Sequence, residues 1–164
     1  MGLLRIRRNP VVEVGAAAPD FDARTTDGQT VRLSELRGRT VLLAFLPCEW
    51  CAVCGIRLRA YEREAERLRA AGLTAIVVTI SDGPDATRFA AALGLEHRVV
   101  LDGTRAITRR FASAFRKAAW GADESRPSAV LIGPDGRVLF AARCQDDEAF
   151  VEPEALLAAL AATS

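Results

Sequence analysis

Short apolar runs along the chain of 164 residues alternate with longer stretches in which apolar and charged residues are mixed. The runs at 40–46 and 73–80 are continuously apolar, so they predict strands buried on both faces of a sheet. A shorter run at 99–101 predicts a third strand. Buried strands separated by helix-length segments are typical of an α/β protein.

The mixed stretches predict amphipathic helices. Within 51–70, Leu58, Tyr61, Ala65 and Leu68 recur at three- and four-residue steps, and Gly72 marks the end of this helix. Further helices are expected from the loop at 81–85 to Leu93, over 104–115, and over 152–162. The stretch 117–126 has no such pattern and is expected to be a surface loop.

Turn residues complete the expected architecture. Asp27-Gly28 predicts a hairpin between 21–25 and 30–33, and 34–38 predicts a short helical turn. The segment 133–136, Gly-Pro-Asp-Gly, predicts a tight turn between strands at 128–132 and 137–142. The expected fold is therefore α/β: a central mixed β-sheet with helices on both faces and an N-terminal β-hairpin extension. We expect one domain, 14–164, after an arm at 1–13.

Composition narrows the function classes. Half of the residues are apolar, 26% are charged, and the net charge is +1, which predicts a soluble globular protein without a nucleic-acid-binding field. The apolar runs are too short to cross a membrane, and no apolar segment follows the N-terminal arginines. These features favour a cytoplasmic protein whose thiols are kept reduced, so a close cysteine pair there is catalytic or metal-binding before it is structural.

Three cysteines fall within seven residues where the strand at 40–46 gives way to a helix: Cys48, Cys51 and Cys54. Helix N-termini favour anions, so a thiolate is stabilised there, and the spacing of Cys51 and Cys54 puts both sulfurs on one helix face within disulfide reach. This pattern favours redox sulfur chemistry. A structural zinc site would also need Cys144, and buried inert cysteines are the other alternative.

Four segments carry a resemblance to a known family: 14–21, 27–38, 45–54 and 133–138. Together they resemble the redoxin branch of the thioredoxin superfamily, and more narrowly the peroxiredoxin-like proteins of the alkyl hydroperoxide reductase/thiol-specific antioxidant (AhpC/TSA) family. The resemblance implies a thioredoxin fold and an oxidoreductase that acts on hydroperoxides or disulfides. It also implies that no cofactor or metal is bound and that a thioredoxin- or glutaredoxin-like protein serves as the reductant. A homodimer is compatible with the resemblance.

Two positions depart from the pattern of ordinary peroxiredoxins. Pro47 and Cys54 fit the family's Pro-x-x-x-Thr/Ser-x-x-Cys motif, but Cys51 replaces the hydroxyl residue, and a thiol is a weak donor. The family's peroxide-orienting arginine would align near Pro127, whereas the arginine of this chain is Arg126, one residue earlier. Pro127 instead matches the cis-proline that thioredoxin-like proteins place against their cysteine pair.

The resemblance therefore leaves two routes open. In a thioredoxin-like route, Cys51 attacks a substrate disulfide and Cys54 resolves the mixed disulfide. In a peroxidase route, the Cys54 thiolate attacks the peroxide and the resulting sulfenic acid condenses with Cys51. Both routes end in a Cys51–Cys54 disulfide.

Other residues take secondary roles in this interpretation. Cys48 is either an accessory resolving thiol or a loop thiol without a role, and Cys144 is expected to be structural rather than resolving. Trp50, with Pro47, Arg126 and Pro127, is expected to shape the substrate groove. His97, the only histidine, is expected to be a surface imidazole. The alternative class is a non-catalytic metal-handling or redox-sensing protein that uses Cys48, Cys51 and Cys54.

Overall fold

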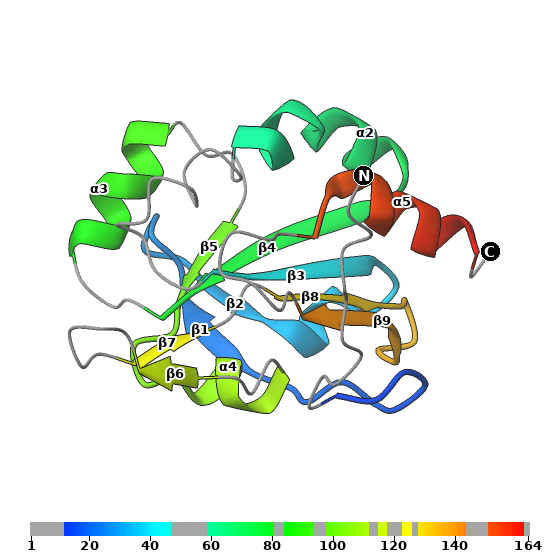
Figure 1. Ribbon diagram of the computed structural model, residues 1–164, viewed down its shortest axis with the longest axis horizontal. Helices are drawn as coiled ribbons and strands as arrows, with labels where there is room; N and C mark the ends of the chain where they lie inside the picture. Colours follow the sequence, from blue (N-terminus) through cyan, green and yellow to red (C-terminus); the bar gives the residue numbers. More distant parts are fainter. Residues whose placement is uncertain are drawn as a thin grey trace.

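A five-stranded mixed sheet forms the centre of the molecule (Figure 1). The computed structural model describes residues 12–46, 59–80, 84–93, 98–111, 115–117, 123–125, 128–143 and 151–162. The strand order is β5-β4-β3-β8-β9, and the parallel strands are β3 (Thr40–Leu46), β4 (Leu73–Thr79) and β5 (Arg98–Leu101). β8 (Ser128–Ile132) and β9 (Val138–Arg143) join as an antiparallel pair. This confirms the predicted α/β class and its central mixed sheet.

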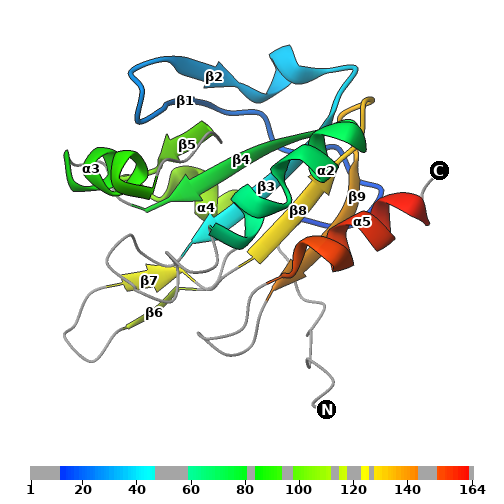
Figure 2. The same cartoon turned by 90° about the horizontal axis from the view of Figure 1, so that it is seen from above.

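Helices cover both faces of the sheet. The helical turns at 59–63, α2 (Ala65–Ala70), α3 (Pro84–Leu93) and α5 (Pro153–Ala161) lie on one face, and α4 (Ala106–Phe111) lies on the other (Figures 1 and 2). β3 supplies both cores: Leu42 and Leu46 pack on the α2 side, and Leu43 and Phe45 on the α4 side. The Tyr61 hydroxyl donates to the Val151 carbonyl at 2.6 Å, which connects the helical turns at 59–63 to the segment just before α5. No helix in the described part of the chain has the length and apolar character needed to cross a membrane.

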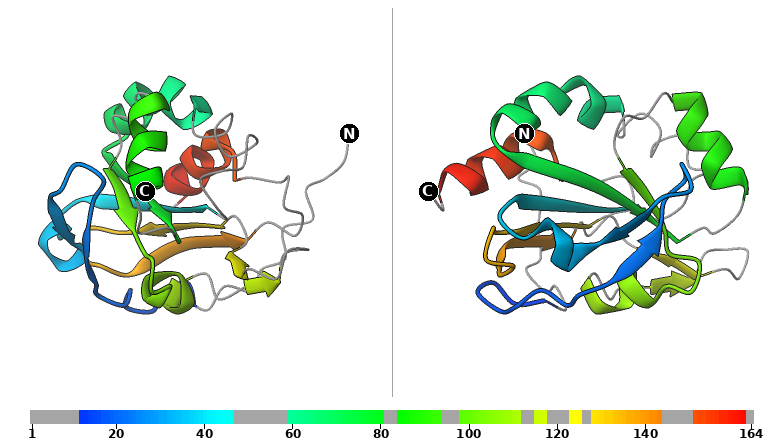
Figure 3. Two further views of the ribbon diagram at one scale, coloured as in Figure 1. Left: turned by 90° about the vertical axis from the view of Figure 1, so that its left-hand side faces the viewer. Right: turned by 180° about the vertical axis from the view of Figure 1, so that it is seen from behind.

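The predicted N-terminal hairpin is confirmed and covers one side of the sheet (Figure 3). β1 (Asp22–Arg24) pairs with β2 (Thr30–Arg32) around the Asp27-Gly28 turn, and the 3-10 helix η1 (Leu33–Leu36) follows. Beyond β1, the Thr26 N–H donates to the Val99 carbonyl at 2.9 Å, so the hairpin shields the outer strand β5. Shielding matters because an open strand edge can pair with other chains.

One predicted helix is too long, and one predicted loop is wrong. The helix expected over 104–115 is α4, which ends at Phe111, and residue 115 already belongs to β6 (Phe115–Lys117). β6 pairs antiparallel with β7 (Asp123–Ser125) inside the expected loop. The register sets basic positions 116 and 117 against acidic positions 124 and 123, which suits a cross-strand pair. The pattern misses this hairpin because a short charged strand has no apolar alternation to reveal it.

Three aromatic rings join α4 and the hairpin to the central strand. Phe111 is fully buried, and its ring lies 5.9 Å from that of Phe45 in a stacked arrangement. Phe21, just before β1, meets Phe111 edge-on at 6.0 Å. Because Phe45 is the penultimate residue of β3, Phe111 packs against the α4 face of the sheet at the end of that strand.

We expect Phe111→Ala to lower the free energy of unfolding by about 3–5 kcal/mol, since it removes a large buried ring and leaves a cavity. Urea unfolding followed by circular dichroism measures the change. Val14→Ala, at a side chain that is 65% exposed, is the control and should leave stability within about 0.5 kcal/mol. Equal midpoints for Phe111→Ala and the control would contradict the packing role of this ring.

Candidate active site

All five strands of the central sheet bring an end together at one end of the sheet. β3, β4 and β5 run parallel, so Leu46, Thr79 and Leu101 are neighbours in register. β8 runs the other way, and its first residue, Ser128, pairs with Phe45. Arg143, the last residue of β9, pairs in turn with Ser128. We call this the Leu46 end, defined by Leu46, Thr79, Leu101, Ser128 and Arg143.

The residues predicted to carry the chemistry lie outside the described residues: Pro47, Cys48, Trp50, Cys51, Cys54, Arg126 and Pro127, together with His97 and Cys144. Their neighbours in the chain are described. Leu46 directly precedes Pro47, and Ser128 directly follows Pro127. The prediction that the cysteine motif follows a buried central strand is therefore confirmed, and the cysteine and proline motifs adjoin two paired strands.

Buried polar residues gather at the Leu46 end. Thr79, Asp102 and Ser128 are between 3% and 5% exposed, and Thr108 is 1% exposed. Sequence reasoning missed all of them, although an aspartate between a strand and a helix is a helix-capping signal. Thr79 ends β4 and Ser128 begins β8, while Asp102 directly follows β5 and Thr108 lies in the first turn of α4. Polar groups are therefore buried close to the strand ends that border the cysteine motif.

Asp102 joins three elements at this end. Its carboxylate accepts the N–H groups of Ile107 at 3.1 Å and Thr108 at 2.7 Å, and also the Thr108 hydroxyl at 2.7 Å. Its own N–H donates to the Thr79 carbonyl at 2.8 Å. Asp102 therefore fixes the start of α4 to the ends of β4 and β5, and its oxygens are occupied by this structural task.

Arg105 closes the turn between β5 and α4 in a strained conformation. Its φ is +60°, and its N–H donates to the Asp102 carbonyl at 2.8 Å. A positive φ is costly for a residue with a side chain, so the surrounding contacts must hold it in place. The anchoring of Asp102 supplies that constraint.

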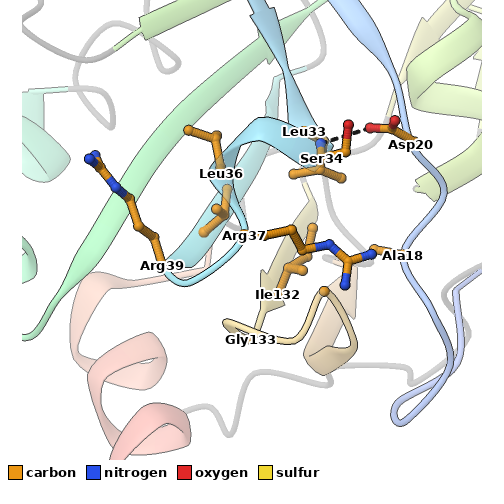
Figure 4. Close-up of a pocket in the computed structure, with 11 residues that line it drawn as sticks. Ala18, Asp20, Leu33, Ser34, Leu36, Arg37, Arg39, Ile132 and Gly133 are labelled. Carbon is orange, nitrogen blue, oxygen red and sulfur yellow. Dashed lines mark hydrogen bonds between the residues drawn. The ribbon is translucent and has the colours of Figure 1, made fainter.

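The opposite end of the sheet is closed by packing (Figure 4). There the lead-in segment 14–21, the turn at 33–39 and the β8–β9 turn surround a cavity of about 20 Å³, room for roughly one water molecule. The Arg37 guanidinium lies against Gly136 and donates to the Asp135 carbonyl. Gly136 has a φ of +77°, which strains any residue with a side chain, so this position favours glycine; a Cβ there would also displace the Arg37 guanidinium. We call this the Gly136 end.

Asp20 organises the Gly136 end. Its Oδ1 accepts the N–H of Phe21 at 3.0 Å and the N–H of Ser34 at 2.9 Å, as Figure 4 shows for Ser34. Desolvation raises the pKa of this carboxyl, but hydrogen bonds from the Ser34 side chain and backbone and from Phe21 outweigh it, so its pKa lies below the ordinary value. The three family-like segments outside the cysteine motif therefore contact one another at the Gly136 end, where their role is structural.

The described residues hold no group of three or more His, Cys, Asp or Glu side chains placed to bind a metal ion. The cysteines that the metal-handling alternative requires lie outside this part of the chain.

A βαβ arrangement, an antiparallel β8–β9 hairpin and a closing helix, with a cysteine motif after the central strand, define a thioredoxin-type α/β protein. Residues 14–141 match the model of the AhpC/TSA family. The chain belongs to this family, which confirms the resemblance inferred from its motifs.

Relatives within this match come from two kinds of thiol protein. The thiol-disulfide oxidoreductase ResA of Bacillus subtilis is 26% identical over 130 residues, 78% of this chain and 66% of ResA, less than two thirds of its length. Peroxiredoxin Bcp of Escherichia coli is 24% identical over 132 residues, 79% of this chain and 84% of Bcp. The crystal structure of peroxidoxin BcpB from Mycobacterium tuberculosis superposes with a TM-score of 0.81 at 18% identity, covering 93% of this chain and 99% of BcpB, which confirms the fold.

We expect Asp102→Ala to destabilise the protein by about 2 kcal/mol or more, because it leaves two buried N–H groups and a buried hydroxyl without their acceptor. Asp22→Ala, at an exposed position of β1, is the matched control and should change stability little. Chemical unfolding of both variants measures the difference. Asp102→Ala as stable as the control would show that water replaces the lost acceptor at no cost.

The lowered pKa of Asp20 predicts a pH-dependent contribution to stability. A carboxyl with a lowered folded-state pKa stabilises the fold above its unfolded-state pKa, and this stabilisation is lost as pH falls through the folded-state pKa. The difference in unfolding free energy between the wild type and Asp20→Asn should therefore be larger near neutral pH and should shrink as the pH falls below the ordinary carboxyl value of 3.8. Asp22→Asn controls for the loss of a surface charge, and a difference for Asp20→Asn that is constant with pH would contradict the shift.

Proposed function

We propose that this protein is a thiol-dependent oxidoreductase of peroxiredoxin-like type, working through a Cys51–Cys54 dithiol–disulfide cycle. Its substrates are hydroperoxides or disulfides. The observation that carries the proposal is the pairing of Phe45 with Ser128, which joins the strand before the cysteine motif to the strand after Arg126-Pro127. Membership of the AhpC/TSA family supports it.

The shared strand ends explain why these motifs can act together. Cys51 is five residues beyond Leu46, and Pro127 is one residue before Ser128. Paired strands are about 5 Å apart, so the two motifs start from neighbouring points of one sheet end. Trp50 and Pro47, from the same segment, are proposed to line the substrate groove with Arg126 and Pro127.

We place hydroperoxide reduction first. The Cys54 thiolate attacks one peroxide oxygen, the O–O bond breaks, and an alcohol leaves after taking up a proton, so Cys54 becomes a sulfenic acid. The Cys51 thiol then attacks the sulfenic sulfur, releasing water and forming the Cys51–Cys54 disulfide. Two electrons have moved from the dithiol to the peroxide.

Disulfide exchange is the second candidate. In this route Cys51 attacks a substrate disulfide, and Cys54 resolves the mixed disulfide. Two observations favour it: Cys51 stands where peroxiredoxins carry a hydroxyl, and one relative, ResA, is named a thiol-disulfide oxidoreductase. Arg126 and Pro127 then act as a dithiol-facing loop instead of a peroxide clamp.

A thioredoxin- or glutaredoxin-like dithiol is the proposed reductant in either route, because it can return two electrons by exchange with the Cys51–Cys54 disulfide. The sulfurs carry the electrons, so the cycle uses no bound cofactor. We propose that it runs in the cytoplasm, within a single domain over 14–164, and that a homodimer is compatible with it.

The proposal predicts a fast fluorescence change when reduced protein meets hydrogen peroxide in a stopped-flow instrument. Trp50 adjoins the sulfurs in sequence, so its emission should report their oxidation. The fast phase should vanish in Cys54→Ser, because a serine hydroxyl without an activating base is a poor nucleophile at neutral pH. It should persist in Cys51→Ser, stopping at the sulfenic acid, and in Cys48→Ser.

Trp50→Phe identifies the reporter, since Trp120 is the other tryptophan of the chain. A wild-type reaction no faster than that of Cys54→Ser would overturn the peroxidase route. A mixed disulfide with a model disulfide substrate that accumulates in Cys54→Ser and does not form in Cys51→Ser would then establish the exchange route. A wild type inactive in both assays would overturn the proposed function.

A further inference from the structure

A cavity of about 400 Å³ lies where the N-terminal hairpin, the end of β5 and α3 meet. Pockets that bind small molecules usually measure roughly 300–1,000 Å³, so this cavity can admit an organic ligand. It borders the Leu46 end through Leu101, the last residue of β5. A ligand here would therefore lie beside the strand ends that border the cysteine motif.

The cavity is lined by hydrogen-bond donors. Arg24, from β1, contributes a guanidinium, and Thr26, Thr87 and Thr104 contribute hydroxyls from the hairpin turn, from α3 and from the segment after β5. Arg24, Thr87 and Thr104 are exposed, so a ligand can reach them. No carboxylate occurs among the lining residues that the structure describes.

Most of these donors have no partner within the described part of the chain. Arg24 makes no ion pair there, and the hydroxyls of Thr26, Thr87 and Thr104 make no hydrogen bond. The N–H groups of Gly103 and Thr104 also lack an acceptor among the described residues. Backbone N–H groups and a cation around one concave surface are the usual surroundings of a bound anion.

Two aspartates adjoin the lining residues in sequence, and the carboxylates of both are engaged. Asp27 accepts hydrogen bonds within its own turn, from the Thr25 hydroxyl and from the Gln29 N–H. Asp102 accepts the N–H groups at the start of α4. Neither forms an ion pair with Arg24, so the charge of that guanidinium is left for a ligand.

Contacts beyond the lining hold the walls of the cavity in place. The Thr26 N–H donates to the Val99 carbonyl at 2.9 Å, which fixes the hairpin turn to β5. The Arg105 N–H donates to the Asp102 carbonyl at 2.8 Å, which closes the turn at 103–104. Donors that are already in place lose little conformational freedom on binding, and this favours affinity.

We propose that this cavity binds an organic phosphate, with the Arg24 guanidinium and the N–H groups of 103–104 as donors to the phosphate oxygens. A phosphate offers more acceptor oxygens than a carboxylate, and the planar fork of arginine matches two of them at once. The volume leaves room for an organic part beside the phosphate. The inference is independent of the proposed thiol chemistry, because no step of it uses a cysteine.

The test is an NMR titration of the ¹⁵N-labelled full chain in phosphate-free buffer at constant pH and ionic strength. The probes are inorganic phosphate and glycerol 3-phosphate. Glycerol controls for the organic part, and glycerate for an anion of similar size that carries a carboxylate. We expect both phosphates to shift the N–H signals of Thr26, Gly103 and Thr104 saturably, and neither control to do so.

Arg24→Ala should weaken the affinity for glycerol 3-phosphate at least about tenfold, because it removes charge-assisted hydrogen bonds. Arg32→Ala is the matched control, since Arg32 is an exposed arginine of the same hairpin that does not line the cavity. Its affinity should equal that of the wild type.

Shifts that rise without saturation, that cluster away from the cavity lining, or that glycerate produces as strongly would overturn the inference. Equal affinities of Arg24→Ala and Arg32→Ala would overturn it as well. Failure of the proposed function gives a different result, because the titration uses no turnover: the protein would bind the phosphates while consuming neither peroxide nor a model disulfide.

Discussion

The pairing of β3 between β4 and β8 is the constraint on which the rest of this structure depends. β3 contributes fully buried side chains to both cores, and its register with both neighbours is continuous. A slip of one residue would turn Leu42 and Leu46 to the α4 face and Leu43 and Phe45 to the α2 face, so both cores would lose their fit. The hydrophobic core thereby fixes where the strand ends, and with it where the cysteine motif begins.

The two ends of the sheet divide structural and chemical tasks. At the Gly136 end, Asp20, Arg37 and the β8–β9 turn lock the lead-in segment against the sheet around a cavity too small for a substrate. At the Leu46 end, strand ends carry the buried polar residues Thr79, Asp102 and Ser128. The family-like segments therefore do not give equal evidence for the function. The segments around Asp20 and Gly136 stabilise the fold. Only the cysteine segment carries residues that are proposed to act in the chemistry.

Much of the sheet could be predicted because its strands are buried on both faces. The runs that became β3 and β4 are continuously apolar, and the turn residues at Asp27-Gly28 and Gly133–Gly136 gave both hairpins. The β6–β7 pair was missed because four of its six residues are charged, and the helix before it was extended past Phe111. Burial signals are strong in sequence, whereas the pairing of two short, mostly charged strands leaves no such signal until both partners are known.

The candidate site was predictable in its residue types and only partly in its neighbours. A Cys-x-x-Cys after an apolar strand indicates its chemistry locally, but Asp102 and Ser128 become neighbours of the site only through strand pairing.

The exchange of a hydroxyl for a thiol at Cys51 has a physical consequence for the proposed cycle. A hydroxyl at that position would donate a hydrogen bond to a peroxide, and a thiol donates only weakly, so the first step loses electrostatic help. In return, the proposed resolving cysteine is only three residues from the attacking one in sequence, so condensation would need little rearrangement of the chain. A site built this way favours rapid closure of a disulfide over rapid attack on peroxide, and its turnover then depends on how quickly that disulfide is passed on.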